Sequence, residues 1–324
     1  VDGEGKAMHK SLGNGVDPYD IMNKYGADLI RLWSASADYH ADMRCSEKIF
    51  KQLSQNYLKF RNTARYCLGN LDGFDPNHLV APNEMEALDR WAITRLNGLI
   101  QKCFQGYDDF DFNVVTHAVN DFCVVDMSNF YLDIIKDRLY CEGRDSLERR
   151  SAQTALYLTL STIAKLFAPI LAFTCDEIWL AMPHTAEDDA RNVVLNDMNK
   201  PFTAYALDAE TMARWEHIIE VRTAVNGALE EARAAKVIGK SLEADVHLTV
   251  PEGDVFLADE NPAALADLFI VSKVELTVGG ELAVKVENAA GTKCPRCWKH
   301  SLTPNAEGLC PRCAEVVRHL PDLL

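Results

Sequence analysis

The sequence predicts a mainly α-helical protein, in which an antiparallel helical bundle is followed by a small α+β module and a C-terminal four-cysteine module. Three observations lead to this prediction. Apolar residues in 44–182 recur every three to four positions, the period of a helix that buries one face. Residues 244–250 alternate apolar and polar side chains, as a half-buried strand does. Two Cys-x-x-Cys pairs lie near the end of the chain.

Composition limits the class of protein. The chain has 324 residues, of which 48% are hydrophobic and 25% charged, which is typical of a globular protein and excludes a disordered or collagen-like chain. No run of about 18 apolar residues is present, so no membrane span is expected. No export signal opens the chain, which starts at Val1 rather than at Met. We therefore expect a fragment of a longer, cytoplasmic protein.

The first predicted segment is 1–43. Asp17 followed by Pro18 is typical of a helix N-terminus, because the carboxylate can cap the first turn and proline suits the first helical position. We expect this short helix to end near Gly26 and a second helix to carry Leu29 and its apolar neighbours.

The second segment, 44–182, predicts four amphipathic helices. They are expected from Ser46 to Leu68, over about 85–106, from Asp111 to Leu139, and over about 147–182 with a break at Pro169. In the third helix, Phe122, Val125 and Phe130 are expected to point inward. The short connections favour an antiparallel bundle.

The remaining chain divides into three segments. Residues 183–239 predict a linker and a long helix. Residues 240–290 predict a small α+β module, with strands at 244–250, within 270–278 and at 282–286, and a short helix that begins at Pro262. Residues 291–324 form the four-cysteine module.

This last module predicts one structural zinc ion. Twelve residues separate the two Cys-x-x-Cys pairs, and each pair can direct two thiolates at one point. Four sulfur ligands in a tetrahedron leave no position for water, so the ion would be structural. Two redox pairs are the alternative. The ligands are expected to be Cys294, Cys297, Cys310 and Cys313. The other six cysteines are scattered singly, as small buried residues in a reducing compartment are.

Charge gives a mixed indication about nucleic acid. The net charge of −15 argues against non-specific binding to phosphates. Two stretches are basic, however: 47–65 carries +4 and 292–324 carries +2. The lysines of the first stretch fall on one helix face and could meet a polyanion, or could form a solvated surface. These lysines are Lys48, Lys51 and Lys59, together with Gln55 and Asn62 on the same face.

The cysteine module also carries Trp298 between two cations, Arg296 and Lys299. A tryptophan beside cations on a rigid scaffold suits base stacking with phosphate contact in single-stranded RNA. The alternative is that Trp298 packs into the core of its own small module.

The loop from Ala7 to Asn14, Ala-Met-His-Lys-Ser-Leu-Gly-Asn, resembles the second signature loop of class I aminoacyl-tRNA synthetases, Lys-Met-Ser-Lys-Ser followed by Leu/Ile-Gly-Asn. Further stretches are similar to the bacterial-type isoleucyl-tRNA synthetases, as is the order of bundle and zinc module. They are Lys59-Phe60-Arg61-Asn62-Thr63, Asp89-Arg90-Trp91-Ala92, Asp126-Met127-Ser128-Asn129-Phe130-Tyr131, and Ile238-Gly239-Lys240-Ser241-Leu242-Glu243-Ala244.

The resemblance implies roles for the segments. Segment 1–43 would be the end of a catalytic core, 44–182 an anticodon-binding bundle and 240–290 a junction module. Lys10 would be catalytic, stabilising the phosphates of ATP, and the ATP site would include Met8, His9, Lys10 and Ser11. The tRNA contacts would include Lys48, Lys51, Lys59, Arg296, Trp298 and Lys299.

The implied partners are ATP with Mg²⁺, isoleucine and tRNA(Ile), and we expect a monomer. Two features depart from the family pattern. Ala7 and His9 replace the first lysine and the serine of the signature, and the family's first signature, His-x-Gly-His, does not occur. The fragment alone is therefore expected to be inactive.

Two alternatives stay open. The chain could come from a class I synthetase for valine, leucine or methionine. It could also be a zinc-stapled helical interaction module that binds no RNA, which the net charge favours.

Overall fold

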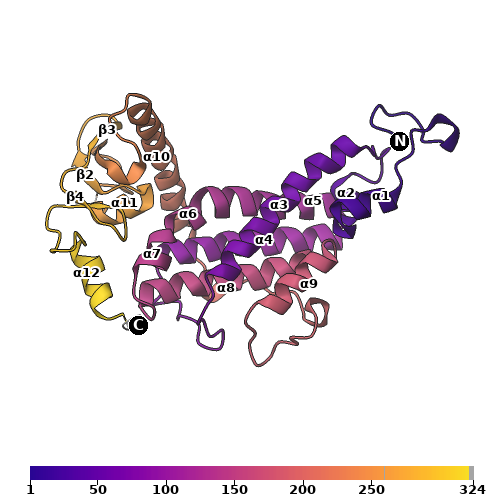
Figure 1. Cartoon of the computed structure of the whole chain (residues 1–324), viewed down its shortest axis with the longest axis horizontal. Coiled ribbons are helices and arrows are strands. Elements are labelled where there is room, and N and C mark those ends of the chain that lie inside the picture. Colours follow the sequence, from indigo (N-terminus) through magenta and orange to yellow (C-terminus); the bar gives the residue numbers. More distant parts are fainter. Residues whose placement is uncertain (259, 321–324) are drawn as a thin grey trace. The chain divides into compact units, whose positions relative to one another are not determined.

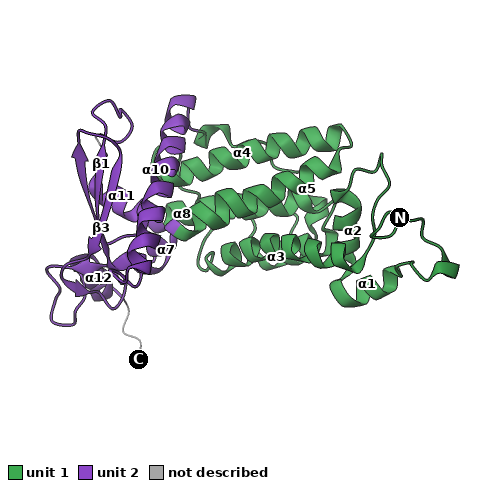
Figure 2. Cartoon of the chain, turned by 90° about the horizontal axis from the view of Figure 1, so that it is seen from above, with its two compact units in different colours: residues 1–133, 150–206 green, residues 134–149, 207–324 purple. Residues whose placement is uncertain are grey.

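The computed structural model describes residues 1–258 and 260–320. It divides into two compact units, which Figure 2 colours separately. Unit 1 consists of residues 1–133 and 150–206, and unit 2 of residues 134–149 and 207–324. The last four residues of the predicted zinc module, 321–324, lie outside the described residues.

Unit 1 begins with a short 3-10 helix η1 (Lys10–Leu12) and two helices, α1 (Pro18–Tyr25) and α2 (Ala27–Ser36). The predicted cap is confirmed, because the Asp17 carboxylate accepts a hydrogen bond from the backbone N–H of Tyr19 at 2.8 Å. α1 ends at Gly26, whose φ of 87° suits a residue without a Cβ atom.

The predicted bundle is present, and its main helices lie side by side along their lengths (Figure 1). Ser46 caps the first of them, as its sequence position indicated. Pro169 ends α8, so that the predicted fourth helix becomes α8 and α9. The helices are α3 (Glu47–Gly69), α4 (Ala87–Asp108), α5 (Phe112–Asp121), α8 (Leu147–Phe167) and α9 (Ala172–Ala181), with short 3-10 turns η3 (Val193–Leu195) and η4 (Thr203–Tyr205) after them.

Contacts at the two ends of the bundle establish the helix directions. The Tyr131 hydroxyl donates to the Asp89 carboxylate at 2.7 Å, so the start of α4 meets the end of the segment that follows α5. The Tyr107 hydroxyl donates to the Leu166 carbonyl at 2.7 Å, so the ends of α4 and α8 meet. α4 and α8 therefore run opposite to α5, as an antiparallel bundle requires.

The segment after α5 differs from the prediction. Residues Phe122–Tyr131 form a π-helix, η2, before the short α6 (Leu132–Ile134). A π-helix bonds residue i to i+5 and so turns the side chains away from the α-helical pattern. Val125, which we expected to point inward, is 57% exposed, whereas Met127 is buried.

Unit 2 contains a three-stranded sheet of order β2-β1-β3. β1 pairs in parallel with β2, which it reaches through α11, and antiparallel with β3. The predicted strand at 244–250 and the predicted helix start at Pro262 are confirmed. The elements are α7 (Lys136–Cys141), α10 (Ala209–Ala234), η5 (Ser241–Glu243), β1 (Ala244–Val250), α11 (Pro262–Phe269), β2 (Lys273–Val278), β3 (Ala283–Asn288), β4 (Thr292–Lys293), β5 (His300–Ser301) and α12 (Pro311–Arg318).

The division into units does not follow the predicted segment boundaries. Residues 134–149 lie inside the predicted bundle segment 44–182, but they belong to unit 2. The cause is a set of contacts between α7 and the four-cysteine module, which are described next. A boundary prediction based on helical periodicity does not detect such contacts.

Candidate metal centre and nucleic-acid interface

The four predicted ligand cysteines lie together in unit 2. Their sulfur atoms are all within 4.8 Å of one another, and three of the four residues are buried. The Sγ atoms of Cys297 and Cys310 are 3.8 Å apart. Four sulfurs at 2.3 Å from a central zinc ion would be about 3.8 Å apart in a tetrahedron. The arrangement therefore fits a metal ion with four sulfur ligands.

The surroundings act in opposite directions on the thiols of this cluster: burial raises the pKa of Cys297 and Cys313, whereas the pKa of Cys294 is lowered. Burial acts to raise the pKa of the Cys294 thiol, but the backbone N–H groups of Cys297, Cys310 and Arg296 donate towards its sulfur and lower the pKa to about 6. The N–H of Cys310 lies 3.4 Å from the Cys294 sulfur. The Arg296 guanidinium lies 3.7 Å from the Cys313 sulfur. These donors compensate negative sulfur ligands.

The local backbone places the first pair of cysteines. The N–H of Trp298 donates to the Cys294 carbonyl at 2.9 Å, and the N–H of Cys294 donates to the Lys299 carbonyl at 2.9 Å, which closes a tight turn. Gly291 lies where β4 and β5 meet, and a Cβ atom there would be 2.4 Å from the Ser301 carbonyl oxygen. Only glycine therefore fits this position.

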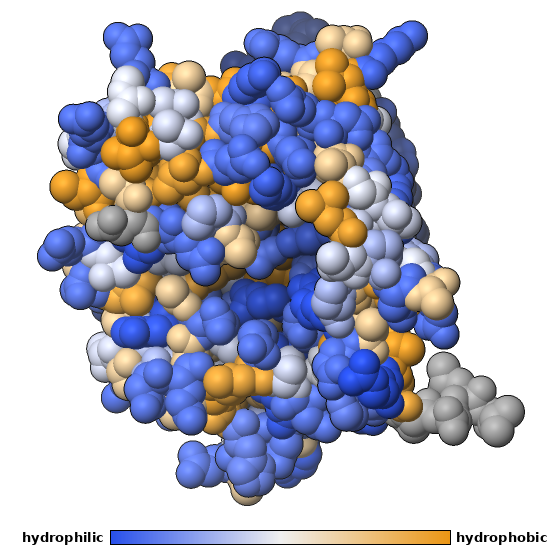
Figure 3. Space-filling model, turned by 90° about the vertical axis from the view of Figure 1, so that its left-hand side faces the viewer, coloured by the Kyte–Doolittle hydropathy of each residue, from blue (hydrophilic) through white to orange (hydrophobic). Residues whose placement is uncertain are grey.

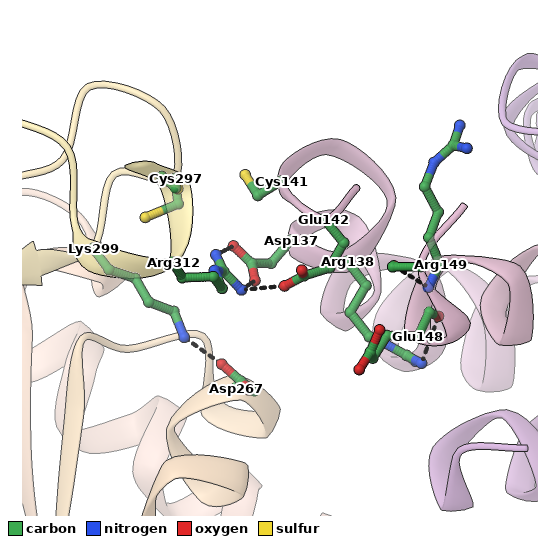
Figure 4. A network of polar contacts seen from close by, with 12 residues as sticks. Asp137, Arg138, Cys141, Glu142, Glu148, Arg149, Asp267, Cys297, Lys299 and Arg312 are labelled. Carbon is green, nitrogen blue, oxygen red and sulfur yellow. Dashed lines mark hydrogen bonds and ion pairs between the residues drawn. The ribbon is translucent and has the colours of Figure 1, made fainter. Parts of the chain in front are cut away.

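Two arginines of the module contact α7 and the residue after it, as Figure 4 shows for Arg312. Arg312 donates to both carboxylate oxygens of Asp137, at 2.5 and 2.8 Å, and to Glu142 at 2.9 Å. Arg296 donates to the backbone carbonyls of Tyr140 and Cys141. Burial acts to raise the pKa of Asp137, but the hydrogen bonds and charge of Arg312 outweigh it and lower that pKa.

The six cysteines outside the cluster are all buried, as predicted. One of them, Cys141, packs against the four-cysteine cluster from α7. Burial raises the pKa of its thiol to about 12, so it is a packing residue in the thiol form.

The predicted RNA-contacting residues fall into two groups. Lys48, Lys51 and Lys59 are exposed on α3, and within the described chain their side chains form no hydrogen bond or ion pair. Trp298 is 54% exposed, which a base-stacking role would need, and the Lys240 ammonium lies 5.4 Å from its ring centroid.

Arg296 and Lys299 form the second group, which differs from the exposed α3 lysines and Trp298. Arg296 is half-buried and donates to the carbonyls of α7, while Lys299 is half-buried and forms an ion pair with Asp267 of α11. Their cationic groups are thus used inside unit 2. Sequence reasoning missed Lys240, which lies far from Trp298 in sequence and gave no signal that it meets the indole.

The predicted ATP loop is exposed, including Met8, His9, Lys10 and Ser11. Asn14 fixes its shape: its side chain donates to Asp2 at 2.8 Å and to the Ala7 carbonyl at 3.1 Å, and accepts from the His9 N–H at 3.0 Å. Lys10 begins η1 and, in the part of the chain that the structure describes, its ammonium contacts no acceptor. Hydrogen bonds from Asn14 therefore fix the backbone of this loop, while the Lys10 ammonium stays available for a ligand.

Two family models match the chain. Residues 1–46 match class I tRNA synthetases (I, L, M and V), and residues 89–248 match the anticodon-binding domain of tRNA ligase. The isoleucine–tRNA ligase of Syntrophotalea carbinolica is 46% identical over 98% of this chain, and that of Desulforamulus reducens is 47% identical over 98%. The chain is homologous to the C-terminal part of isoleucine–tRNA ligases.

The homology covers a part of the isoleucine–tRNA ligases only. The chain spans 36% of the length of each of these two relatives. Among solved structures, the complex of an Agrobacterium radiobacter K84 LeuRS with tRNA and LeuAMS is similar, with a TM-score of 0.48 and 13% identity over 89% of this chain and 26% of that chain.

The surface and the helices give two further findings. On the face that Figure 3 shows, hydrophilic residues predominate and hydrophobic residues form separate patches. Within residues 1–258 and 260–320, no helix combines the length and the apolar character that crossing a membrane requires.

Proposed function

We propose that this chain is the tRNA-binding C-terminal part of an isoleucine–tRNA ligase, which activates isoleucine with ATP and Mg²⁺ and transfers it to tRNA(Ile). The single observation that carries the proposal is about 46% identity to enzymes of that name over 98% of the chain. Segment 1–43 would end the catalytic core, 44–182 would be the anticodon-binding bundle, and 240–290 the junction module. The complete enzyme would be a cytoplasmic monomer.

In this proposal the RNA surface has two parts. The exposed lysines of α3, Lys48, Lys51 and Lys59, contact tRNA phosphates without first having to leave an intramolecular partner. Trp298 stacks on a base, and Lys240 beside its ring supplies the cation. Arg296 and Lys299 act indirectly, because their contacts within unit 2 hold the turn that presents Trp298.

One Zn²⁺ is the proposed cofactor of the four-cysteine module. Its ligands would be Cys294, Cys297, Cys310 and Cys313, whose sulfur spacing suits tetrahedral coordination. The ion would supply folding energy to residues 291–324 and no chemistry, since four protein ligands leave no open position.

Lys10 is the residue proposed to act in adenylate formation. The exposed loop with Met8, His9, Lys10 and Ser11 would contact ATP once the rest of the enzyme is present, and the free ammonium of Lys10 would meet negative charge that develops on the phosphates. Ala7 and His9 replace the first lysine and the serine of the family signature, so in this proposal the loop would act with only the second of the two signature lysines, Lys10.

A tRNA titration tests the proposal. The chain should bind tRNA(Ile) with an affinity that falls steeply from 50 to 200 mM salt, because phosphate contacts release counterions. tRNA(Val) and tRNA(Met) serve as matched RNA controls and should bind more weakly. Absence of salt-dependent tRNA binding would favour the interaction module, and tighter binding of a control tRNA would favour another synthetase of the class.

A further inference from the structure

A cavity of about 270 Å³ opens in unit 1, lined by residues of α2, α3 and α5 and by Phe167 at the end of α8. Its inner wall is apolar and aromatic. Phe60 and Phe167 are buried and pack edge to face, with ring centroids 5.1 Å apart. An apolar cavity of about 150 Å³ holds a benzene ring. This larger cavity therefore has room for a planar heterocycle of one or two rings.

Three carboxamides line the same cavity, and they come from Gln52, Asn56 and Asn120. Gln52 and Asn56 are exposed at its mouth. The side-chain oxygen of Asn120 is shielded from solvent and accepts no hydrogen bond from the residues that the structure describes. A shielded acceptor without a donor is unfavourable, so this atom indicates a ligand that donates to it.

His117 adds a further acceptor. Its Nδ1 lies 2.7 Å from the Asn113 carbonyl oxygen, which can only accept, so Nδ1 is the protonated nitrogen of the neutral ring and Nε2 of that form can accept. No lysine, arginine, aspartate or glutamate lines the cavity. The ligand is therefore neutral, and a phosphate or carboxylate is excluded from the cavity itself.

A ligand that is neutral, planar and rich in hydrogen-bond donors and acceptors matches a nucleobase. Carboxamides pair with the donor and acceptor atoms on base edges, as asparagine and glutamine do with adenine. Aromatic walls such as those of Phe60 and Phe167 accept the flat face of a base.

The surroundings of the mouth favour a base that is attached to RNA. Gln52 comes four residues after Lys48, and Asn56 comes three residues before Lys59, so these side chains are neighbours in one row along α3. Both lysines are exposed, and they lie about 16 Å apart along the helix axis. A phosphate chain can thus lie across the lysines while a base enters between them.

We propose that this cavity takes up a nucleobase that is turned out of the stack of bound RNA. The inference rests on the proposed tRNA-binding function and adds a specific subsite to it. Lys48 and Lys59 hold the backbone, the carboxamides of Asn56 and Asn120 pair with the base edge, and the phenyl wall contacts the base face.

Substitutions in α3 and α5 test the subsite in the full chain. Asn56→Ala and Asn120→Leu should each weaken tRNA(Ile) binding by about tenfold. The slope of affinity against salt should stay unchanged, because neither variant removes a charge. Gln101→Ala and Asn83→Ala are the controls, since both side chains are exposed, lie outside α3 and do not line the cavity, and these variants should bind like the unaltered chain.

The possible results separate the hypotheses. Equal effects of cavity and control variants would overturn the subsite while tRNA binding itself stands. Absence of tRNA binding by the unaltered chain would overturn the proposed function as well. A free nucleoside is the other ligand that the cavity could take, and titration with adenosine, guanosine, cytidine and uridine tests for it. If a nucleoside binds saturably while Asn56→Ala leaves tRNA affinity unaffected, the cavity belongs to a free nucleoside and the RNA-base proposal is overturned. Asn56 is exposed, so its variant keeps the test valid if Asn120→Leu fails to fold.

Discussion

The guanidinium of Arg312 binds the carboxylate of Asp137 through two parallel hydrogen bonds, although the two residues are 175 positions apart. This contact joins α7 to the helix that carries Cys313. Asp137 therefore helps to position a cysteine ligand that lies far away in sequence.

Replacing this aspartate should loosen the four-cysteine module. Asp137→Asn removes one charge and one arm of the bidentate pair, and a charge-assisted hydrogen bond of this kind contributes about 1.5–3 kcal/mol. We expect faster hydrogen exchange in α12 and unchanged exchange in α4. Asp145→Asn, at an exposed aspartate of the same unit, is the control.

The same variant should change the pH dependence. The folded structure lowers the pKa of Asp137 from its ordinary value of 3.8, so this residue contributes stability above that value, and the contribution is lost as the pH falls through the lowered pKa. Asp137→Asn should therefore make the stability of unit 2 less sensitive to acid below about pH 4. An acid profile identical to that of the unaltered chain would contradict this role.

Loss of one ligand cysteine should remove the metal. Cys310→Ser should lower bound zinc from one ion per chain to near zero and unfold residues 291–320 locally, because metal binding is folding energy in so small a module. Elemental analysis and hydrogen exchange measure the two effects. Cys45 is a buried cysteine outside the cluster, and the control variant Cys45→Ala should retain one zinc ion per chain. Full zinc occupancy in Cys310→Ser would refute the four-ligand assignment.

The lysines of α3 should determine part of the salt dependence of tRNA binding. Changing Lys48, Lys51 and Lys59 to glutamine should lower affinity and reduce the salt slope by up to about three units. Lys273→Gln with Lys285→Gln provides a control, because both lysines are already ion-paired on the sheet. A slope unchanged by the triple substitution would identify the α3 lysines as a merely solvated face.

Trp298→Ala should weaken tRNA binding by about ten- to a hundredfold without loss of zinc, since stacking on an exposed indole contributes roughly 1–3 kcal/mol per base. Zinc content and tRNA affinity are measured in the same preparation. Phe173→Ala, another exposed aromatic residue, is the control. Loss of zinc together with affinity would mean that the indole serves the module rather than the RNA.

Lys10 should matter for chemistry rather than for RNA binding. In the complete enzyme, Lys10→Ala should slow ATP–pyrophosphate exchange by at least tenfold and leave tRNA affinity within twofold, because its partner is charge that develops in the transition state. Lys6→Ala, whose ammonium is paired with Glu4, is the control. Equal losses in both measurements would place Lys10 in the RNA surface.

Local chemistry made much of the fold predictable. Asp17 and Ser46 cap the helices that they were predicted to cap, since a short polar side chain before an apolar period marks a helix start. The strand at 244–250 was predicted because strict alternation has one structural interpretation. The cysteine cluster was predicted because two Cys-x-x-Cys pairs at this spacing can bring four sulfur atoms to one point.

Long-range pairing could not be predicted in the same way. Arg296 and Lys299 looked like free cations, and their actual acceptors, the α7 carbonyls and Asp267, carry no signature that links them to the zinc module. The unpaired oxygen of Asn120 also has no sequence signal, because it arises from the packing of several helices.

The π-helical stretch Phe122–Tyr131 has a consequence for chain length. Each of its turns takes up about one residue more than an α-helical turn, and Tyr131 at its end still reaches Asp89. A relative that is about two residues shorter here could wind the same stretch as an ordinary α-helix and keep that hydrogen bond. Insertions and deletions at this point would then be absorbed by the winding of one helix, and the buried tyrosine–aspartate pair would persist through them.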